Sequence, residues 1–509
     1  MKKIIALAIL ICCAIVTYAQ QFYDVTKYGA KKDSSAKATT AIKKAIEAAS
    51  KAGGGTVYFP AGKYLTGAIH LKSNITIFID AGAELHFSDD FDDYLPMVES
   101  RYEGVDIISF SPLFYAYKAE NITIKGRGKI NGHGKKWWDY VLKFPKDQPR
   151  NKWQLMFDSL NKNILLPDDP GQMKRGFMRP PFIQPMYCKN VLIDGITITN
   201  SPFWTINPEF CENITVNAVT IDNPLSPNTD GVNAESCKYV HVSNCHISVG
   251  DDCITIKSGK DIPGRTKNMP AENYTITNCT MLNGHGGVVI GSEMSGGVKK
   301  IVISNCVFDG TDRGIRIKTT RGRGGVVEDI RVDNIVMKNI KQQAIVLDMQ
   351  YTRAAAEPLS ERTPQFRNIR LSNITAYTKQ AMYINGLDEM PVSEISLNDI
   401  VFEAETGIVI KNAKDIELHN VRVNTKTGPA LQADKVQRLD IDGLISAKPI
   451  ADMPLIKLNN VQDVLLRNCW PFSGTKNFVT INGTDTKNVK LVNNELGEAT
   501  IVYGEEVKR

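Results

Sequence analysis

The chain has 509 residues, of which 42% are apolar and 23% are charged, a composition typical of a folded globular protein and not of a disordered one. Its formal net charge is +6 at neutral pH, so only mild attraction to anions is expected. No dense run of basic residues with interleaved aromatic residues occurs, which argues against nucleic acid as a partner.

Residues 1–19 have the pattern of a secretory signal peptide, with two lysines, an apolar stretch over residues 4–16 and a small residue, Ala19, at the cleavage position. The apolar stretch is shorter than the roughly 20 residues of a membrane-spanning helix, and no other stretch is apolar enough, so no membrane span is predicted. Cys12 raises the alternative of a lipoprotein, but the preceding Ile11 fits such a cleavage site poorly. We expect an exported protein, periplasmic or extracellular in a bacterium.

Residues 20–70 are predicted to form an N-terminal cap region. Apolar and small residues from Thr39 to Lys51 recur at helical spacing, and three glycines, residues 53–55, follow as a stop signal. Because the open end of a repeat protein must be covered, we interpret this segment as a short capping helix.

Residues 131–182 interrupt a β pattern that runs on either side of them. The segment carries several tryptophans and basic residues, namely Trp137, Trp138, Lys143, Lys146, Arg150, Lys152, Trp153, Lys174, Arg175 and Arg179. Two interpretations stay open: a surface insertion with solvated charges, or a loop that walls one end of a binding cleft.

Beyond the insertion, a short segment with alternating apolar residues recurs along the chain. Its first apolar positions are 191, 214, 240, 274, 301, 330, 369, 395, 416, 439, 464 and 489. A second column of apolar strands keeps pace with it at 232, 254, 288, 315, 345, 382, 408, 430, 456 and 479. Both columns alternate with period two, as half-buried strands do.

Two columns of short strands that repeat together predict an all-β fold, the right-handed parallel β-helix, in which stacked coils supply the core. Leucine-rich repeats have a similar period, but their Leu-x-x-Leu-x-Leu signature is missing. We predict that residues 20–509 form a single β-helix domain. Eight cysteines lie within it without metal-type spacing, and buried free thiols are the favoured interpretation over disulfide bridges.

Four short polar motifs stand just before, or inside, strands of the second column. They are Asn228-Thr229-Asp230, Gly250-Asp251-Asp252, Gly284-His285-Gly286 and Arg316-Ile317-Lys318. The positions taken as equivalent in the four strands are Val232, Ile254, Val288 and Ile315.

In that alignment the polar residues share nearly one phase. Asp230 and Asp252 fall two residues before the marker, and Asp251 and His285 fall three before it. The two cations of the last motif follow their marker by one and three residues. Neighbouring parallel strands lie about 4.8 Å apart, so we expect three carboxylates, one imidazole and two cations in one row.

Such a row suits hydrolysis of a glycosidic bond, which needs a proton donor for the leaving oxygen and a carboxylate that attacks or activates water. Crowded carboxylates resist further ionisation, so at least one Asp is expected to keep its proton near neutral pH. A single motif would be weak support, because Asn, Asp and Gly also favour turns. Four motifs in order and in phase are much stronger.

The four motifs resemble those of glycoside hydrolase family 28, the polygalacturonases. Other segments that resemble family signatures are Tyr28-Gly29-Ala30, Gly53-Gly54-Gly55-Thr56-Val57, Phe59-Pro60-Ala61-Gly62 and Asn200-Ser201-Pro202-Phe203-Trp204. The resemblance extends over most of the chain. It implies a right-handed parallel β-helix that hydrolyses pectin with inversion and without a metal or cofactor.

The resemblance also implies roles for individual residues. Asp251 resembles the general acid, Asp230 and Asp252 resemble the pair that activates water, and His285 resembles the residue that assists the acid. The residues expected to bind the substrate are Arg316, Lys318, Asn228 and Tyr351.

The stretches 247–253 and 287–294 look more like the bacterial exo-acting branch, and Gly250 stands where endo-acting enzymes often carry Gln. We therefore expect exo-acting hydrolysis of α-1,4-linked galacturonic acid, with the insertion closing one end of the groove. Endo-acting and rhamnogalacturonan-directed hydrolysis are the alternatives. The expected partner is a pectic polysaccharide or oligosaccharide, and the protein is expected to be a monomer.

Two hypotheses from other classes stay open. A pectate lyase shares the coil, and three aspartates in line can bind the calcium that it needs. A non-catalytic, carbohydrate-binding β-helix would keep the coil without needing the aspartate row.

Overall fold

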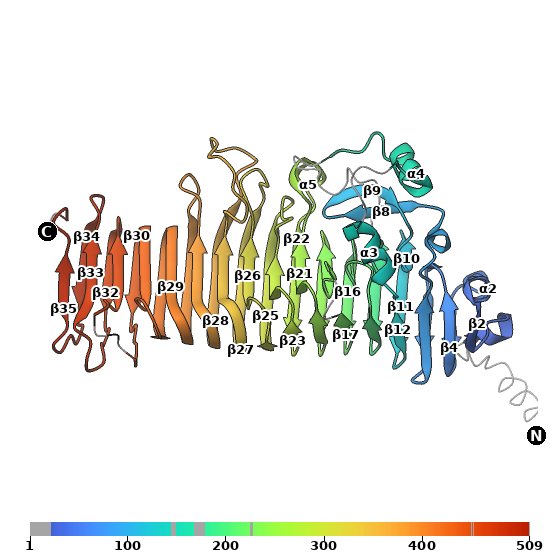
Figure 1. Cartoon of the computed structure of the whole chain (residues 1–509), viewed down its shortest axis with the longest axis horizontal. Coiled ribbons are helices and arrows are strands. Elements are labelled where there is room, and N and C mark those ends of the chain that lie inside the picture. Colours follow the sequence, from blue (N-terminus) through green and yellow to red (C-terminus); the bar gives the residue numbers. More distant parts are fainter. Residues whose placement is uncertain are drawn as a thin grey trace, which may run out of the picture.

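The computed structural model describes residues 22–143, 149–166, 179–223, 227–448, 450 and 452–507, and they form one long solenoid of parallel strands (Figure 1). The predicted signal segment, residues 1–19, lies outside the described residues. The chain winds as a right-handed parallel β-helix, which confirms the predicted fold class. Figure 1 shows the N-terminal coils at one end and the C-terminal coils at the other.

Three parallel sheets run along the solenoid. The first begins with the strands β1 (Phe22–Asp24), β3 (Gly55–Phe59), β6 (Ile75–Ile79) and β11 (Glu120–Gly126). It continues with strands of the first predicted column: β14 (Lys189–Asp194), β16 (Glu212–Asn217), β19 (Lys238–Ser243), β22 (Ala271–Thr277), β32 (Gln462–Arg467) and β34 (Lys487–Val492).

The second sheet contains shorter strands that the repeat analysis did not separate from the turns. They are β2 (Asp33–Lys37), β4 (Gly62–Thr66), β7 (Ala83–Phe87), β12 (Lys129–Asn131), β15 (Thr197–Thr199), β17 (Thr220–Asn223), β20 (His246–Val249) and β23 (Thr280–Asn283).

The third sheet contains the strands of the second predicted column, together with earlier strands before residue 190 and a last strand after residue 499 that the column did not include. They are β5 (Ile69–His70), β10 (Phe114–Tyr117), β13 (Ile183–Met186), β18 (Val232–Glu235), β21 (Asp252–Lys257), β24 (Gly286–Ile290), β26 (Ile315–Lys318), β31 (Ile456–Asn459), β33 (Asn477–Asn482) and β35 (Thr500–Tyr503). Longer strands bend from one sheet into the next: β25 (Val298–Asp309), β27 (Val326–Asp348), β28 (Gln365–Asn385), β29 (Val392–Thr425) and β30 (Leu431–Asp442).

The strand register confirms the predicted alignment of the coils. Val232 pairs with Ile254, Ile254 with Val288, and Val288 with Ile315. One predicted position was wrong: Ile408 pairs with Leu431 and not with residue 430. Ala430 and Leu431 are both apolar and both buried, so alternation alone did not distinguish them.

The predicted capping helix is confirmed as α2 (Thr39–Lys51). Ala41, Ile42, Ala45, Ile46 and Ala49 are buried on one face of it, at the spacing of an amphipathic helix. The helix stands at the N-terminal end of the solenoid, where it covers the first coils (Figure 1). Two 3-10 turns, η1 (Val25–Tyr28) and η2 (Phe91–Tyr94), belong to the same end of the chain.

The described parts of residues 131–182, predicted to interrupt the repeat, contain two helices. They are α3 (Lys135–Lys143) and α4 (Lys152–Leu160). Asn151 begins α4 with a capping box that it shares with Gln154. Trp137 is fully buried in the main core, so the insertion is packed onto the solenoid through aromatic contacts.

An antiparallel hairpin of β8 (Val98–Tyr102) and β9 (Val105–Ser109) projects beside the third sheet towards the short helix α5 (Asp261–Lys267) (Figure 1). Its turn lies so close to the chain before α5 that a Cβ on Gly104 would come within 2.6 Å of the Lys260 backbone nitrogen. Glycine is therefore required at this tip. The hairpin is outside the repeat and was not predicted.

All eight cysteines in the described residues are buried free thiols, in agreement with the favoured interpretation. Within those residues, no helix has both the length and the apolar character needed to cross a bilayer.

Candidate active site

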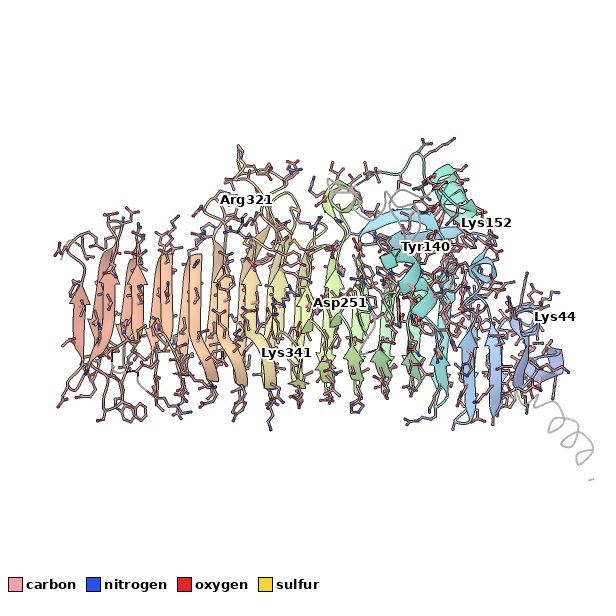
Figure 2. The ribbon with its side chains drawn as sticks, in the orientation of Figure 1. Lys44, Tyr140, Lys152, Asp251, Arg321 and Lys341 are labelled. Atoms are coloured by element: carbon pink, nitrogen blue, oxygen red, sulfur yellow. The ribbon has the colours of Figure 1, made fainter. Side chains whose placement is uncertain are left out.

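The register brings the predicted site residues together on the third sheet. Asp252 is the first residue of β21 and pairs with Gly286 of β24, the residue that follows His285. Asp230 precedes β18, and the chain bends at Gly250 and Asp251 before β21 begins. Figure 2 shows Asp251 near the middle of the solenoid. The motifs therefore converge as their common phase predicted.

Asp251 is held by three donors. The Asp252 backbone N–H donates to Asp251 Oδ1 over 2.9 Å, and His285 Nδ1 lies 3.1 Å from the same oxygen. The Asn228 side-chain amide donates to Asp251 Oδ2 over 3.2 Å. The His285 side chain is 51% exposed, so the pair can exchange protons with solvent.

Asp230 is buried, and its hydrogen-bond donors among the described residues are neutral. The Thr255 hydroxyl donates to its Oδ2 over 3.1 Å, and the Asn233 amide donates to the same oxygen over 3.3 Å. Burial, followed by the negative charge of Asp251, raises the pKa of Asp230 well above its ordinary value. The expectation of one proton-retaining carboxyl therefore falls on Asp230 in the ligand-free protein.

Asp251 and His285 shift in the opposite sense. Burial alone would raise the pKa of Asp251, but the hydrogen bond and charge of His285, together with Lys318 and Lys257, outweigh burial and lower it. The hydrogen bond to Asp251 in turn raises the pKa of His285. The contact therefore favours a charged Asp251 carboxylate beside a protonated His285 imidazole.

Asp252 is the partner of both predicted cations. Lys318 Nζ donates to Asp252 Oδ2 over 3.0 Å, and Arg316 Nη1 lies 3.8 Å from Oδ1. Both cations also lie 5.4 Å from the ring centre of Tyr351. Tyr351 is 45% exposed, so it stands at the mouth of the site, where the resemblance placed a tyrosine.

Sequence reasoning missed three residues of the same row. Asn233 and Thr255 each follow their marker by one residue, as Arg316 does, and Lys257 follows its marker by three, as Lys318 does. The repeat phase that identified the motifs would have found them. Lys257 forms a buried ion pair with Glu293 at 2.7 Å and lies 4.7 Å over the Trp204 ring.

The coils on the N-terminal side of the aspartates are covered by other parts of the chain. The outward-facing side chains on the coils before Asp230 and on β18 are fully buried: Gln184, Asn207, Glu209, Asn233 and Glu235. The hairpin covers them, since the Ser100 hydroxyl donates to Gln184 Oε1 over 2.8 Å. The surface of these coils is therefore covered and not exposed to solvent.

Arg101 anchors this cover. Its buried guanidinium lies 2.9 Å from Glu235 and 3.8 Å from Glu209, and it stacks 4.4 Å over the Phe210 ring. A small second core backs the hairpin and consists of Tyr102, Val105, Ile107, Phe157, Phe203 and Trp204. Phe157 belongs to α4, so the insertion supports the hairpin that covers these coils.

The candidate basic residues of the insertion whose side chains are described bond to protein groups. Arg179 is 1% exposed and donates to Asn228. Lys152 pairs with Asp92 at 2.6 Å, and Arg150 pairs with Asp158. The side chains of Lys143, Lys146, Lys174 and Arg175 lie outside the described residues.

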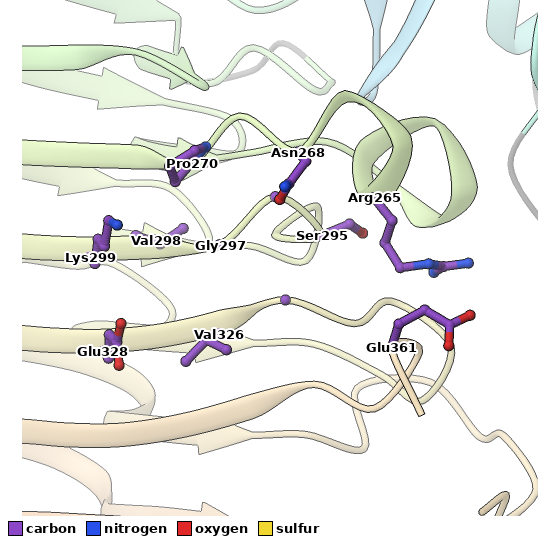
Figure 3. A pocket seen from close by; sticks show the side chains of 12 residues that line it. Arg265, Asn268, Pro270, Ser295, Gly297, Val298, Lys299, Val326, Glu328 and Glu361 are labelled. Atoms are coloured by element: carbon purple, nitrogen blue, oxygen red, sulfur yellow. The ribbon is translucent and has the colours of Figure 1, made fainter. Parts of the chain in front are cut away.

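A cavity of about 590 Å³ lies elsewhere, between α5 and the loops that follow β24 and precede β27 (Figure 3). None of the predicted site residues lines it. Its charged side chains are largely paired, Lys299 with Glu272 and Glu328 with Arg367. The chemistry of the aspartate row, and not the size of a cavity, therefore identifies the site.

Comparison with known proteins agrees with this geometry. The family model described as glycosyl hydrolases family 28 matches residues 168–437, more than half of the chain. The chain belongs to this family. It is a glycoside hydrolase, and all four motifs lie in the matched range. A second model, described as rhamnogalacturonase A/epimerase, pectate lyase-like, matches residues 22–141.

Individual relatives include exo-acting members of the family. The chain is 32% identical to the solved structure of a hyperthermoactive exopolygalacturonase from Thermotoga maritima, with a TM-score of 0.71 over 79% of this chain and 91% of that one. It is 29% identical to an exo-poly-alpha-D-galacturonosidase of Dickeya chrysanthemi, over 84% of this chain and 75% of that one. A probable polygalacturonase of Vitis vinifera is 33% identical, over 62% of this chain and 60% of that protein.

Proposed function

We propose that the protein hydrolyses α-1,4-linked galacturonic acid in pectic chains, that it acts from a chain end, and that it inverts the anomeric carbon. The observation that carries the proposal is the aspartate row beside Arg316 and Lys318, in a groove closed on one side by the hairpin. The exo-acting relatives from Thermotoga maritima and Dickeya chrysanthemi support the same mode of attack.

The geometry suits a single displacement in which Asp251 acts as the acid. Asp251 is the carboxyl that meets the half-exposed His285, so it can be recharged from solvent through the imidazole. Asp230 and Asp252 share one phase one coil apart and can flank a water molecule as its bases. Inverting glycosidases need this division between one acid and a separate water-activating carboxylate.

Binding of the sugar carboxylate is assigned to Arg316 and Lys318. In the ligand-free protein both cations lie against Asp252, so an incoming carboxylate would compete for them. Such competition would loosen the hold of the cations on Asp252 when substrate binds and free that carboxylate to bind water. Tyr351, beside both cations, would contact the sugar at the open side of the groove.

The electrostatics imply a bell-shaped pH profile. Below the raised pKa of Asp230 this water-activating carboxylate is protonated and activity falls. Above the pKa of the Asp251–His285 pair the proton donor is lost and activity falls again. The acid limb should therefore lie above the ordinary range of an Asp, which is about 3.9.

The deciding experiment is a time course on polygalacturonate with product sizing and with NMR of the first product. The proposal predicts mono- or digalacturonate from the start, slow loss of viscosity, and β-anomer released from the α-linked substrate. A ladder of intermediate oligomers would show endo attack, α-anomer first would show retention, and an unsaturated product that absorbs ultraviolet light would show a lyase.

We further propose that the protein is exported and acts as a monomer on a pectic substrate. The signal-like pattern of residues 1–19 supports export. Cleavage near Ala19, observed by mass spectrometry of the mature protein, would test it, and modification at Cys12 would show a lipoprotein instead.

A further inference from the structure

Arg179, at the end of the insertion, occupies the same position in its coil as Asn228 does two coils later. Ile183 and Val232, four residues after Arg179 and Asn228 respectively, are aligned through bridges to Ile206. Arg179 therefore lies in the phase of the active-site motifs, although it precedes them by two coils.

The Arg179 side chain reaches across the intervening coil to the first motif. Its Nη1 donates to the Pro227 carbonyl oxygen over 2.7 Å and lies 3.5 Å from the Pro202 carbonyl oxygen that it passes. Its Nη2 donates to Asn228 Oδ1 over 2.7 Å, and the guanidinium stacks 4.9 Å over the Phe203 ring. Arg179 is 1% exposed, so its side chain is held inside the protein.

The contact fixes which way the Asn228 amide faces. A guanidinium has only donors, so the amide oxygen must face Arg179 and the amide NH₂ must face the other way. That NH₂ lies 3.2 Å from Asp251 Oδ2. In this orientation Asn228 can donate to the carboxyl of Asp251 and cannot accept a proton from it.

We propose that Arg179 is a positioning residue for the reaction: by locking the Asn228 amide, it aims the Asp251 proton at the substrate. This inference rests on the proposed function, in which Asp251 is the acid. The Asp252 backbone N–H and His285 already occupy Asp251 Oδ1. With Asn228 held as a donor, a proton on Oδ2 finds no acceptor among these neighbours and is left for the glycosidic oxygen.

The charges that face Asp251 set the expected pH effect. His285, Lys318 and Lys257 favour its charged form, whereas Asp230 and the adjacent Asp252 oppose it. Loss of the Asn228 donor, or of the Arg179 charge, would also favour the protonated form and move the alkaline limb of the pH profile to higher pH. Loss of the Asn228 donor and loss of the Arg179 charge move the alkaline limb in the same direction, so a second variant is needed to separate the two effects.

The test uses Arg179→Met, Asn228→Ala and the double variant, assayed on oligogalacturonate across pH. For Arg179→Met we expect kcat to fall about 10- to 100-fold, the usual cost of a misaligned catalytic group, with KM changed by less than about threefold. The alkaline limb should move to higher pH. Because Arg179 acts through Asn228, the double variant should be no slower than Asn228→Ala alone.

The chain supplies a matched control far from the site. Arg331 donates to the Asn368 side-chain oxygen over 3.1 Å, and the Asn368 amide donates to Asp329 over 2.6 Å. The same Arg–Asn–Asp series of hydrogen bonds therefore exists away from the proposed active site. Arg331→Met should leave kcat and the pH profile unchanged. A similar loss in this control would show that Arg179 has a merely structural role.

Other outcomes overturn the inference clearly. Independent, multiplying losses in the double variant would mean that Arg179 does not act through Asn228, and unchanged kcat in Arg179→Met would remove its role altogether. If Arg179→Met does not fold, Arg179→Lys decides, since it keeps the charge but loses the rigid fork of donors. If Arg179→Lys had the kcat of the wild-type protein, the guanidinium donors would not be needed to position Asn228, and the inference would be refuted. Wild-type protein inactive on galacturonides would refute the proposed function instead.

Discussion

Replacement of Arg101 by Met would test the closed side of the groove most directly. Arg101 neutralises two fully buried carboxylates, Glu209 and Glu235, and holds the hairpin tip by donating to the Gly104 carbonyl oxygen over 2.9 Å. Removing one partner of a buried ion pair costs about 3–5 kcal/mol, because the remaining charge is left without compensation. We expect a loss of that size at pH 7.

The loss should depend on pH in a definite direction. Burial already raises the pKa of Glu209 and Glu235 above the ordinary value, and the charge of Arg101 opposes that rise. Groups with a raised folded-state pKa favour folding below their unfolded pKa of about 4.3 and lose that contribution as pH rises. Without Arg101 the pKa values of Glu209 and Glu235 rise further. The loss of stability in Arg101→Met should therefore be small near pH 4 and reach its full size near neutral pH.

Thermal unfolding followed by circular dichroism at pH 4 and pH 7 measures the effect, and product sizing on polygalacturonate measures its consequence. With the hairpin loosened, longer oligomers should appear among the early products. Glu235→Gln in the Arg101→Met background should recover part of the stability, since it removes one stranded charge. Lys435→Met, which breaks the exposed pair with Asp388, should cost no more than about 1 kcal/mol.

A loss below about 1 kcal/mol at pH 7, or an equal loss at both pH values, would contradict the account of Arg101 as a buried counter-charge. A displaced hairpin with unchanged product sizes would contradict the account of the hairpin as the barrier that enforces exo attack.

Three further predictions concern the aspartate row. Lys318→Ala should lower kcat/KM about tenfold to a hundredfold, because a charge-assisted hydrogen bond is worth roughly 1.5–3 kcal/mol. Replacement of the exposed Lys341 by Ala should have no effect. Equal kinetics in the two variants would show that the sugar carboxylate binds elsewhere. Asp251→Asn should nearly abolish cleavage of oligogalacturonates and partly spare a galacturonide with a good leaving group, and equal losses on both substrates would argue against a proton donor. His285→Gln should move the alkaline limb of the pH profile to lower pH, because the proton held by His285, whose pKa is raised, is lost. An unmoved limb would show that His285 does not supply a proton to Asp251.

The parts of the fold that repeat could be predicted from the sequence, because each coil restates the same pattern. The helix Thr39–Lys51 and the pairing of Val232, Ile254 and Val288 are as expected. The second sheet was not resolved as a separate column, since strands such as Thr197–Thr199 are too short for alternation to be recognised. Alternation also failed at Ala430 and Leu431, where two apolar residues stand side by side.

The hairpin could not be predicted, because nothing in its own sequence shows what it covers. Its strands pair only with each other, and the contacts that fix its position join Ser100 to Gln184 and Arg101 to Glu235, far apart in the chain. The sequence left two interpretations of the insertion open, and in the structure it contacts the hairpin through Phe157, in a small apolar core.

The row itself shows where repeat phase stops being informative. Asp230 and Asp252 hold the same position on successive coils, and phase alone gives them the same role. Their surroundings differ, since Asp252 is ion-paired with Lys318, whereas Asp230 receives only neutral donors from Thr255 and Asn233 and its pKa is raised by burial. Stacking decides which groups meet, and the partners that neighbouring coils supply decide the charge around each of them. Two identical residues in one phase therefore have different electrostatic surroundings, and we assign the acid limb of the activity profile to Asp230, whose pKa burial raises.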